Sequence, residues 1–335
     1  MPSQQTQLQQ YDPAVYTQRS PNILKAILKN HFQSFSDKYS EKYDTEYGKI
    51  RLERIDSFKD SLISCGDYTK GIARIQCSNP ECKHEIFRPF SCKRFYFCPS
   101  CSQKRAILFG EHISNEVLFK LPHRHFVFAF PKMLRLFFRN NKKVLSDIAR
   151  LICEMIIEYY KMLTGKEIRT GIVLAFQSYG DFLRYNPHFH ALIMEGGLAK
   201  NLLSWKHSGF SIDNSIRVAT SDNKAREAIA QYMARCPISL NKIIYEPFKG
   251  KVIFKTKYNK YFKENHKVYD ADEFIAKLVQ HIPLPRIRLI RYFDLYSSKS
   301  RGKWKDWDHV SKLAPDGWKE QNGIGIQGEE IEKTG

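Results

Sequence analysis

Two histidines stand one residue apart in the segment Asn186–Leu192, which reads NPHFHAL and continues into further apolar residues. That composition indicates a buried strand. Side chains two positions apart in a strand share a face, so His188 and His190 would point the same way and Phe189 would point into the opposite layer. Two imidazoles on one face can bind one divalent ion. The alternative interpretation is a pair of buried histidines that hydrogen-bond only to backbone groups.

A third ligand is expected on the preceding strand. Gln177 lies about as far before the polar turn SYGDFLRYNP as His188 lies after it, so an antiparallel register would bring its amide oxygen opposite the histidines. Two nitrogens and one oxygen, with positions left for a phosphate oxygen and water, suit Mg²⁺ or Mn²⁺, although imidazole also accepts zinc or nickel. We therefore expect a catalytic divalent ion at His188, His190 and Gln177.

A nucleophile for phosphate chemistry is expected on the helix that spans residues 222–236, DNKAREAIAQYMARC. Its apolar residues recur at helical spacing, and Tyr232 falls on the face that would pack against the sheet. A tyrosine beside an ion-bound phosphodiester can attack phosphorus. The alternative is an ordinary core tyrosine.

The cysteines are concentrated in one block, because six of the eight fall between Cys65 and Cys101. In a chain without an apparent export signal, such crowding indicates a metal rather than disulfides. Two pairs of closely spaced cysteines that face each other would complete one tetrahedral structural zinc site. The four expected ligands are Cys77, Cys82, Cys98 and Cys101. Three further residues lie close enough to replace one of these or to build a second site: Cys92, Cys65 and His84. Reduced structural thiols without metal are the alternative.

The composition indicates a polyanionic partner. The 335 residues include 54 Lys and Arg against 35 Asp and Glu, a formal net charge of +19. The alternative is a basic surface that is solvated and binds no polyanion. We find no apolar run long enough for a signal peptide or membrane helix, which predicts a cytoplasmic location, and no phosphate-binding loop for a nucleotide cofactor.

The order of elements predicts an α+β fold with an antiparallel sheet flanked by helices. We expect strands at 125–130, 172–177 and 188–194, helices at 143–163 and 222–236, and a hairpin around Lys249-Gly250, with the two histidines on an inner strand. Four regions are predicted: a flexible arm over 1–20, a helical and zinc-binding domain over 21–120, a catalytic domain over 121–305 and a flexible tail over 306–335.

Four motifs occur together in the chain: FSCKRFYFCPSC, AFQSYGDFLRYNPHFHALIMEGGL, IAQYMARCPISL and HIPLPRIRLIRYFDLYSSKSRG. In this order they resemble the rolling-circle insertion-sequence transposases of the IS-ninety-one type, a branch of the His-hydrophobe-His endonucleases that use a catalytic tyrosine. The resemblance implies that His188 and His190 bind the metal, that Tyr232 is the nucleophile and that Gln177 occupies a third-ligand position. Two-tyrosine members have a second tyrosine where this chain has Ala228, so it resembles a single-tyrosine branch.

The function that this resemblance implies is nicking of single-stranded or hairpin DNA at element ends through a 5′-phosphotyrosine, followed by rejoining in rolling-circle transposition. Two segments, 251–267 and 286–296, alternate cations with Phe and Tyr, as a surface for single-stranded DNA would, or else as ordinary amphipathic strands. Tyr292 and Tyr296 share the spacing of a tyrosine pair but fall in another motif. The alternatives are a rolling-circle replication initiator or relaxase, and a zinc-containing DNA-binding regulator that does not cleave.

Overall fold

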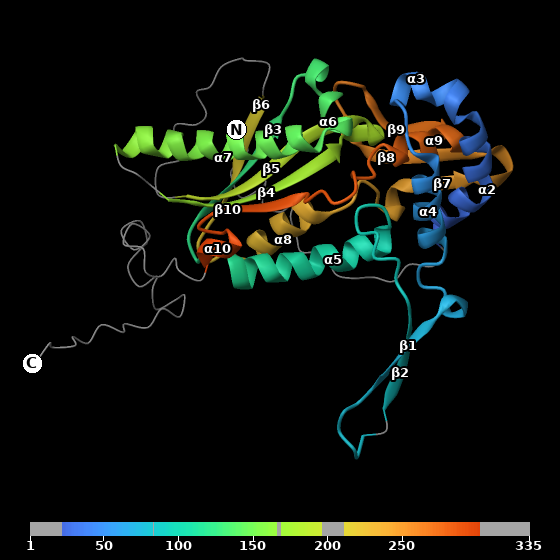
Figure 1. Ribbon diagram of the computed structural model, residues 1–335, viewed down its shortest axis with the longest axis horizontal. Coiled ribbons are helices and arrows are strands. Elements are labelled where there is room, and N and C mark those ends of the chain that lie inside the picture. Colours follow the sequence, from blue (N-terminus) through green and yellow to red (C-terminus); the bar gives the residue numbers. More distant parts are fainter. Residues whose placement is uncertain (1–21, 83, 166–168, 196–210, 302–335) are drawn as a thin grey trace, which may run out of the picture.

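The structure, a computed structural model, describes residues 22–82, 84–165, 169–195 and 211–301 (Figure 1). The predicted arm and tail lie outside these residues. The α+β class with an antiparallel sheet is confirmed. The central sheet has five strands in the order β10-β4-β5-β3-β6, and every neighbouring pair is antiparallel. The strands are β3 (His123–Ala129), β4 (Gly171–Tyr179), β5 (Tyr185–Met194), β6 (Ser211–Val218) and β10 (Ile290–Asp294).

The strand with the two histidines, β5, lies in the middle of this sheet, between β4 and β3. The register places Gln177 directly opposite His188, and it places Ala175 and Val127 on either side of His190. Residues that face each other across antiparallel strands share a side of the sheet. The turn between β4 and β5 therefore aligns Gln177 with the histidines as the sequence predicted.

Helices cover both faces of the central sheet (Figure 1). On one face, α7 (Lys142–Thr164) packs its apolar stripe onto Phe126, Phe189 and Ile193. Asn141 caps the start of α7 by accepting hydrogen bonds from two backbone amides, and Gly165 ends it in the left-handed region. The α7 layer therefore packs on the face of the sheet opposite the two histidines.

The opposite face is covered by α8 (Asn223–Ala234), and α5 (Pro99–His112) packs against α8. Asp222 caps α8 through the amide of Ala225. The two helices approach closely at Gly110, where a Cβ atom would lie 2.6 Å from Cγ of Gln231. Because only glycine permits that approach, α5 fixes the position of the helix that carries Tyr232.

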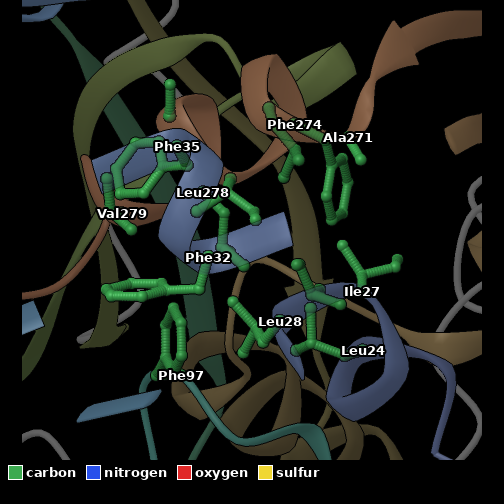
Figure 2. Close-up of a cluster of buried hydrophobic side chains, with 14 of the residues drawn as sticks. Leu24, Ile27, Leu28, Phe32, Phe35, Phe97, Ala271, Phe274, Leu278 and Val279 are labelled. Carbon is green, nitrogen blue, oxygen red and sulfur yellow. The ribbon is translucent and has the colours of Figure 1, made fainter. Parts of the chain in front are cut away.

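A second core joins the N-terminal helices to a small sheet from the other end of the chain (Figure 2). Phe32 and Phe35 of α2 (Ile23–Lys38) pack with Phe274 of α9 (Ala271–Val279). The sheet has the strand order β7-β8-β9. Packing therefore crosses the domain boundary that the sequence predicts near residue 120. The strands are β7 (Ile243–Glu246), β8 (Lys251–Asn259) and β9 (Glu264–Asp270).

A two-stranded hairpin, β1 (Ile72–Gln76) with β2 (Glu85–Pro89), extends away from the rest of the molecule (Figure 1). None of the helices that the structure describes has the length and apolar content needed to span a membrane. The remaining helices are α3 (Asp44–Tyr47), α4 (Leu52–Ile63), α6 (Phe137–Asn140) and α10 (Ser298–Arg301). Short helical turns are η1 (Tyr39–Tyr43), η2 (Tyr68–Lys70), η3 (Ile113–Val117), η4 (Lys132–Leu134), η5 (Asp181–Leu183), η7 (Leu240–Lys242) and η8 (Pro247–Lys249).

Candidate active site and metal centres

The two histidines of β5 converge on one point. Nε2 of His188 lies 3.0 Å from Nε2 of His190, and both side chains are buried. Two ligand atoms at right angles, each about 2.1 Å from one octahedral ion, are about 3.0 Å apart. The donor pair therefore fits a divalent ion. Nδ1 of His188 donates to the carbonyl oxygen of Asn186 at 2.6 Å, which leaves the Nε2 lone pair of that ring for a ligand.

A third histidine, His125 on β3, orients the second ring. Its Nε2 lies 3.0 Å from Nδ1 of His190, and the two rings are stacked with centroids 5.1 Å apart. When Nδ1 of His190 donates to His125, Nε2 is the nitrogen that faces His188 and can bind an ion. His125 was not among the residues expected at this site from the sequence. The signal was present, because His123 and His125 form a second pair with the spacing of His188 and His190.

All three histidines are neutral at physiological pH. Burial lowers the pKa of His125 to about 4 and lowers the pKa values of His188 and His190 as well. The positive guanidinium groups of Arg235 and Arg135 lower the pKa of His188 further. A neutral imidazole is the form that can bind a metal.

Gln177 connects the histidines to the end of α8. Its Nε2 donates to the carbonyl oxygens of Tyr232 and Met233 at 3.0 and 3.2 Å. The last carbonyls of a helix have no intrahelical partner, so Gln177 satisfies two of them and holds the helix end on the sheet. Its amide oxygen does not take part in these two bonds.

Tyr232 lies next to the histidines, as expected from its helix face. Its ring centroid is 5.1 Å from that of His190 and 6.3 Å from that of His125, both in edge-on contacts. The guanidinium carbon of Arg235 lies 3.8 Å from the centroid of the Tyr232 ring. A phenol, two imidazoles and a cation are thus gathered at one end of α8.

The two basic segments with aromatic residues differ in their surroundings. In the first, Tyr258 and Tyr261 on the β8–β9 hairpin are 62% and 80% exposed. Five lysines on the same hairpin are exposed as well: Lys255, Lys257, Lys260, Lys263 and Lys267. The second segment contains β10, where Arg291 donates to Ser146 of α7 and Tyr292 packs against a core cluster. The β8–β9 hairpin is therefore the more exposed of the two segments.

Tyr296, at the end of the second segment, is a core residue. Its hydroxyl lies 2.5 Å from Nε2 of His123 and accepts a hydrogen bond from the amide of Phe119. A Cβ atom at Gly171 would lie 2.4 Å from its ring, so glycine is needed where the first residue of β4 meets Tyr296. Burial raises the pKa of Tyr296, which keeps its hydroxyl protonated. Tyr296 therefore belongs to a hydrophobic core that packs against the sheet.

Four cysteines form a compact cluster of thiols: Cys65, Cys92, Cys98 and Cys101. The Sγ atoms are 3.5 Å apart for Cys65 and Cys101, 3.6 Å for Cys92 and Cys101, and 3.8 Å for Cys98 and Cys65. Four sulfurs placed tetrahedrally around zinc at about 2.3 Å are about 3.8 Å apart. The cluster thus fits a zinc ion. Hydrogen bonds from the other three thiols lower the pKa of Cys65.

The ligand set expected from the sequence overlaps with this cluster but is not identical to it. Cys98, Cys101 and Cys92 take part, but the fourth thiol is Cys65. Cys77 and Cys82 lie instead at the far end of the β1–β2 hairpin, beyond the Gln76–Glu85 pair. The reason is that the chain between Cys65 and Cys92 runs out and back as a hairpin, which brings its two ends together and carries the cysteine pair at its tip away from them.

Comparison with known proteins agrees with this arrangement. Residues 27–130 match the family model described as a transposase zinc-binding domain, and residues 171–216 and 205–303 match the model described as a putative transposase. The cysteine cluster lies within the first match, and the histidines with Tyr232 lie within the second. The two matches thus support a transposase with an N-terminal zinc-binding domain.

A curated relative agrees with both matches. The transposase for insertion sequence element IS801 of Pseudomonas savastanoi pv. phaseolicola is 28% identical over 198 residues, which cover 59% of this chain and 46% of the relative. The chain thus spans about half the length of that relative. The two family matches and this relative support an IS-ninety-one-type transposase with an N-terminal zinc-binding domain. No solved structure matches it significantly.

Proposed function

We propose that this transposase cleaves single-stranded DNA at element ends through a covalent 5′-phosphotyrosine at Tyr232 and then rejoins strands in rolling-circle transposition. The observation that carries the proposal is the contact between the ring of Tyr232 and that of His190, 5.1 Å between centroids, on the side of the sheet where His188 and His190 converge. A phosphodiester that reached these histidines would also reach the phenol.

The chemistry follows from the residues at this point. The phenolic oxygen of Tyr232 forms a bond to phosphorus, and the bond from phosphorus to the 3′-oxygen breaks. In net terms, the proton lost by the phenol is gained by the departing 3′-oxygen, which becomes a hydroxyl. Arg235 is placed to attract the phosphate group to the Tyr232 ring. The phosphotyrosine conserves the ester, so a 3′-hydroxyl can later reverse the step without a nucleotide cofactor.

A divalent ion, Mg²⁺ or Mn²⁺, fits beside the nucleophile. We propose His188, His190 and the amide oxygen of Gln177 as its ligands. When bound, such an ion supplies positive charge at a non-bridging oxygen of the scissile phosphate. The protein contributes the orientation: His125 holds the His190 ring, and Gln177 ties the ion site to the helix end that carries Tyr232.

The proposed substrate is single-stranded or hairpin DNA. A scissile phosphate within a paired duplex would have to fit between a sheet and the helix packed on it, whereas an unpaired strand can be threaded there. The exposed lysines and tyrosines of the β8–β9 hairpin would bind the strand by charge and stacking. Affinity should therefore fall steeply as salt rises.

A nicking assay on single-stranded DNA that carries the element ends tests the proposal. The parent should cleave in Mg²⁺ or Mn²⁺ and retain a 5′-linked DNA fragment through denaturing electrophoresis. Tyr232→Phe, which removes one oxygen and keeps the ring, should abolish both products. Equal cleavage by the parent and Tyr232→Phe would remove Tyr232 from its role.

Separate variants test the ion site. Changing His188 and His190 to Ala should abolish metal-dependent nicking and leave the zinc content unchanged, because the thiol cluster lies in the other family match. Loss of zinc from that double variant would contradict the separation of the two metal centres. A replication initiator would make the same covalent product, so transfer of one element end to a second strand distinguishes transposition.

A further inference from the structure

A cleft opens beside the end of α8 that carries Tyr232. The space between its walls is continuous with solvent. Gln177, Met233 and Arg235 line it, and two of these contact Tyr232 directly: Gln177 through the Tyr232 carbonyl and Arg235 through its ring. Tyr232 does not itself line the cleft, but Arg235 connects the cleft to the Tyr232 ring.

The walls of the cleft are rich in aromatic rings from four different parts of the chain. Tyr179 and Tyr185 come from the two ends of the β4–β5 connection, Phe138 comes from α6 and Tyr96 from the zinc-binding region. The Tyr185 ring is already part of a stack, 6.2 Å from the nearly parallel ring of His281, with the Arg139 guanidinium 4.9 Å from its centroid. A ring with an uncovered face can stack on another planar group.

Tyr96 is held in this wall by the cysteine cluster. It lies in the five-residue loop between Cys92 and Cys98, both members of the cluster. The next residue, Phe97, is 2% exposed and is anchored in the second core (Figure 2). The loop is also closed by hydrogen bonds from the amides of Phe97 and Cys98 to the carbonyl oxygen of Arg94. Thiol ligands and a buried ring thus fix both sides of Tyr96.

We propose that this cleft receives one unstacked base of the single-stranded DNA, next to the phosphodiester that Tyr232 attacks, and that the zinc site serves recognition by holding Tyr96 against that base. The inference rests on the proposed function and deepens it. A base is the occupant that fits, because the walls provide aromatic rings for stacking and Arg235 provides a cation beside the adjoining phosphate. A base within a duplex is already stacked and paired and could not enter.

Binding to two oligonucleotides tests the proposal without any cleavage. The probes are a fluorescent twelve-residue thymidine strand and a strand of equal length that lacks all bases, measured by anisotropy with zinc-loaded protein and no added Mg²⁺. Substitution of an aromatic residue on which one base stacks typically weakens binding about 5- to 150-fold. Tyr96→Leu should weaken binding of the thymidine strand by a factor in that range and leave binding of the abasic strand unchanged.

Matched variants separate stacking from folding. Tyr96→Phe retains the ring and should bind as the parent does. Tyr68→Leu removes a tyrosine that is 60% exposed and lies outside the cleft, and it should change neither affinity. If Tyr96→Leu loses zinc or its cooperative thermal transition, Tyr185→Leu decides the matter, because that ring comes from β5 and not from the zinc-binding region.

Three results would overturn the inference: equal weakening for both strands, no weakening for either, or displacement of the thymidine strand by millimolar thymidine monophosphate, which would indicate a pocket for a free nucleotide. The outcome is distinguishable from failure of the proposed function. A protein that binds in a base-dependent way but forms no covalent adduct would retain the cleft and lose the phosphotyrosine. If the parent forms the adduct but these variants show no base-dependent loss of affinity, the phosphotyrosine is retained and the base-binding cleft is rejected.

Discussion

Acidification should destabilise this protein through two histidines that lie outside the proposed ion site, His123 and His281. Burial lowers the pKa of His123 to about 3 and that of His281 to about 4, whereas an unfolded chain has a value of about 6.5. Because the folded pKa lies below the unfolded one, the unfolded state binds protons first, and stability falls as the pH falls below about 6.5. The loss is about 1.4 kcal/mol per pH unit, or roughly 2 kcal/mol for each residue by pH 5.

His281 gives the cleaner test. Its Nε2 lies 3.1 Å from the carbonyl oxygen of Leu183 and its Nδ1 lies 3.1 Å from the Ser178 hydroxyl, so the neutral ring is held from both sides. The charges of Arg139 and Lys277 oppose its protonation further. The perturbation is His281→Gln, which keeps a polar side chain and removes the titration.

The assay is the free energy of unfolding in urea at pH 7, 6 and 5, for the parent and His281→Gln, at one fixed excess of zinc. Any release of zinc at low pH affects both proteins and cancels in the comparison. Between pH 7 and 5 the variant should lose about 2 kcal/mol less stability than the parent. If both proteins lose the same amount, the reasoning from the buried neutral ring is refuted.

Three further predictions concern the zinc site, the sheet and the strand-binding surface. Cys65→Ser should remove bound zinc in a metal analysis of the purified protein, whereas Cys77→Ser should retain it; the opposite result would restore the ligand set expected from the sequence. Gly171→Ala should lower the free energy of unfolding by about 1–3 kcal/mol, because the new methyl group meets the Tyr296 ring at 2.4 Å, and unchanged stability would contradict that contact. Lys257→Ala should reduce the salt dependence of single-strand binding by about 0.7 in the logarithmic slope, and an unaltered slope would place the strand elsewhere.

Periodicity predicted the parts of the fold that bury one clear face. The helix around residues 143–163, the strand with His188 and the helix with Tyr232 all have strong apolar patterns, and each was expected near its actual bounds. The edge strands were not. β6 reads SIDNSIRV, with little alternation, and β10 carries cations that favoured a DNA-binding interpretation over a strand. Edge strands need to satisfy only one neighbour, so their sequences are less constrained.

The candidate site shows the same division. The spacing of His188 and His190 indicated a shared face because a strand makes that relation local. The contact of His125 with His190 depends on which strand lies beside β5, which spacing alone does not determine. The pairing of Cys65 with Cys101 depends likewise on a hairpin that returns the chain to its start. Local geometry could be predicted, whereas contacts between distant segments required the fold.

The second core has a consequence for the newly synthesised chain. The apolar face of α2 leaves the ribosome early, but its partner α9 begins at Ala271, 233 residues after the end of α2 at Lys38. At a translation rate of about 5–20 residues per second, α2 waits for about 12–47 s before that partner begins to be made. A chain released before α9 is complete would expose a hydrophobic surface, and chaperones and proteases would compete for it.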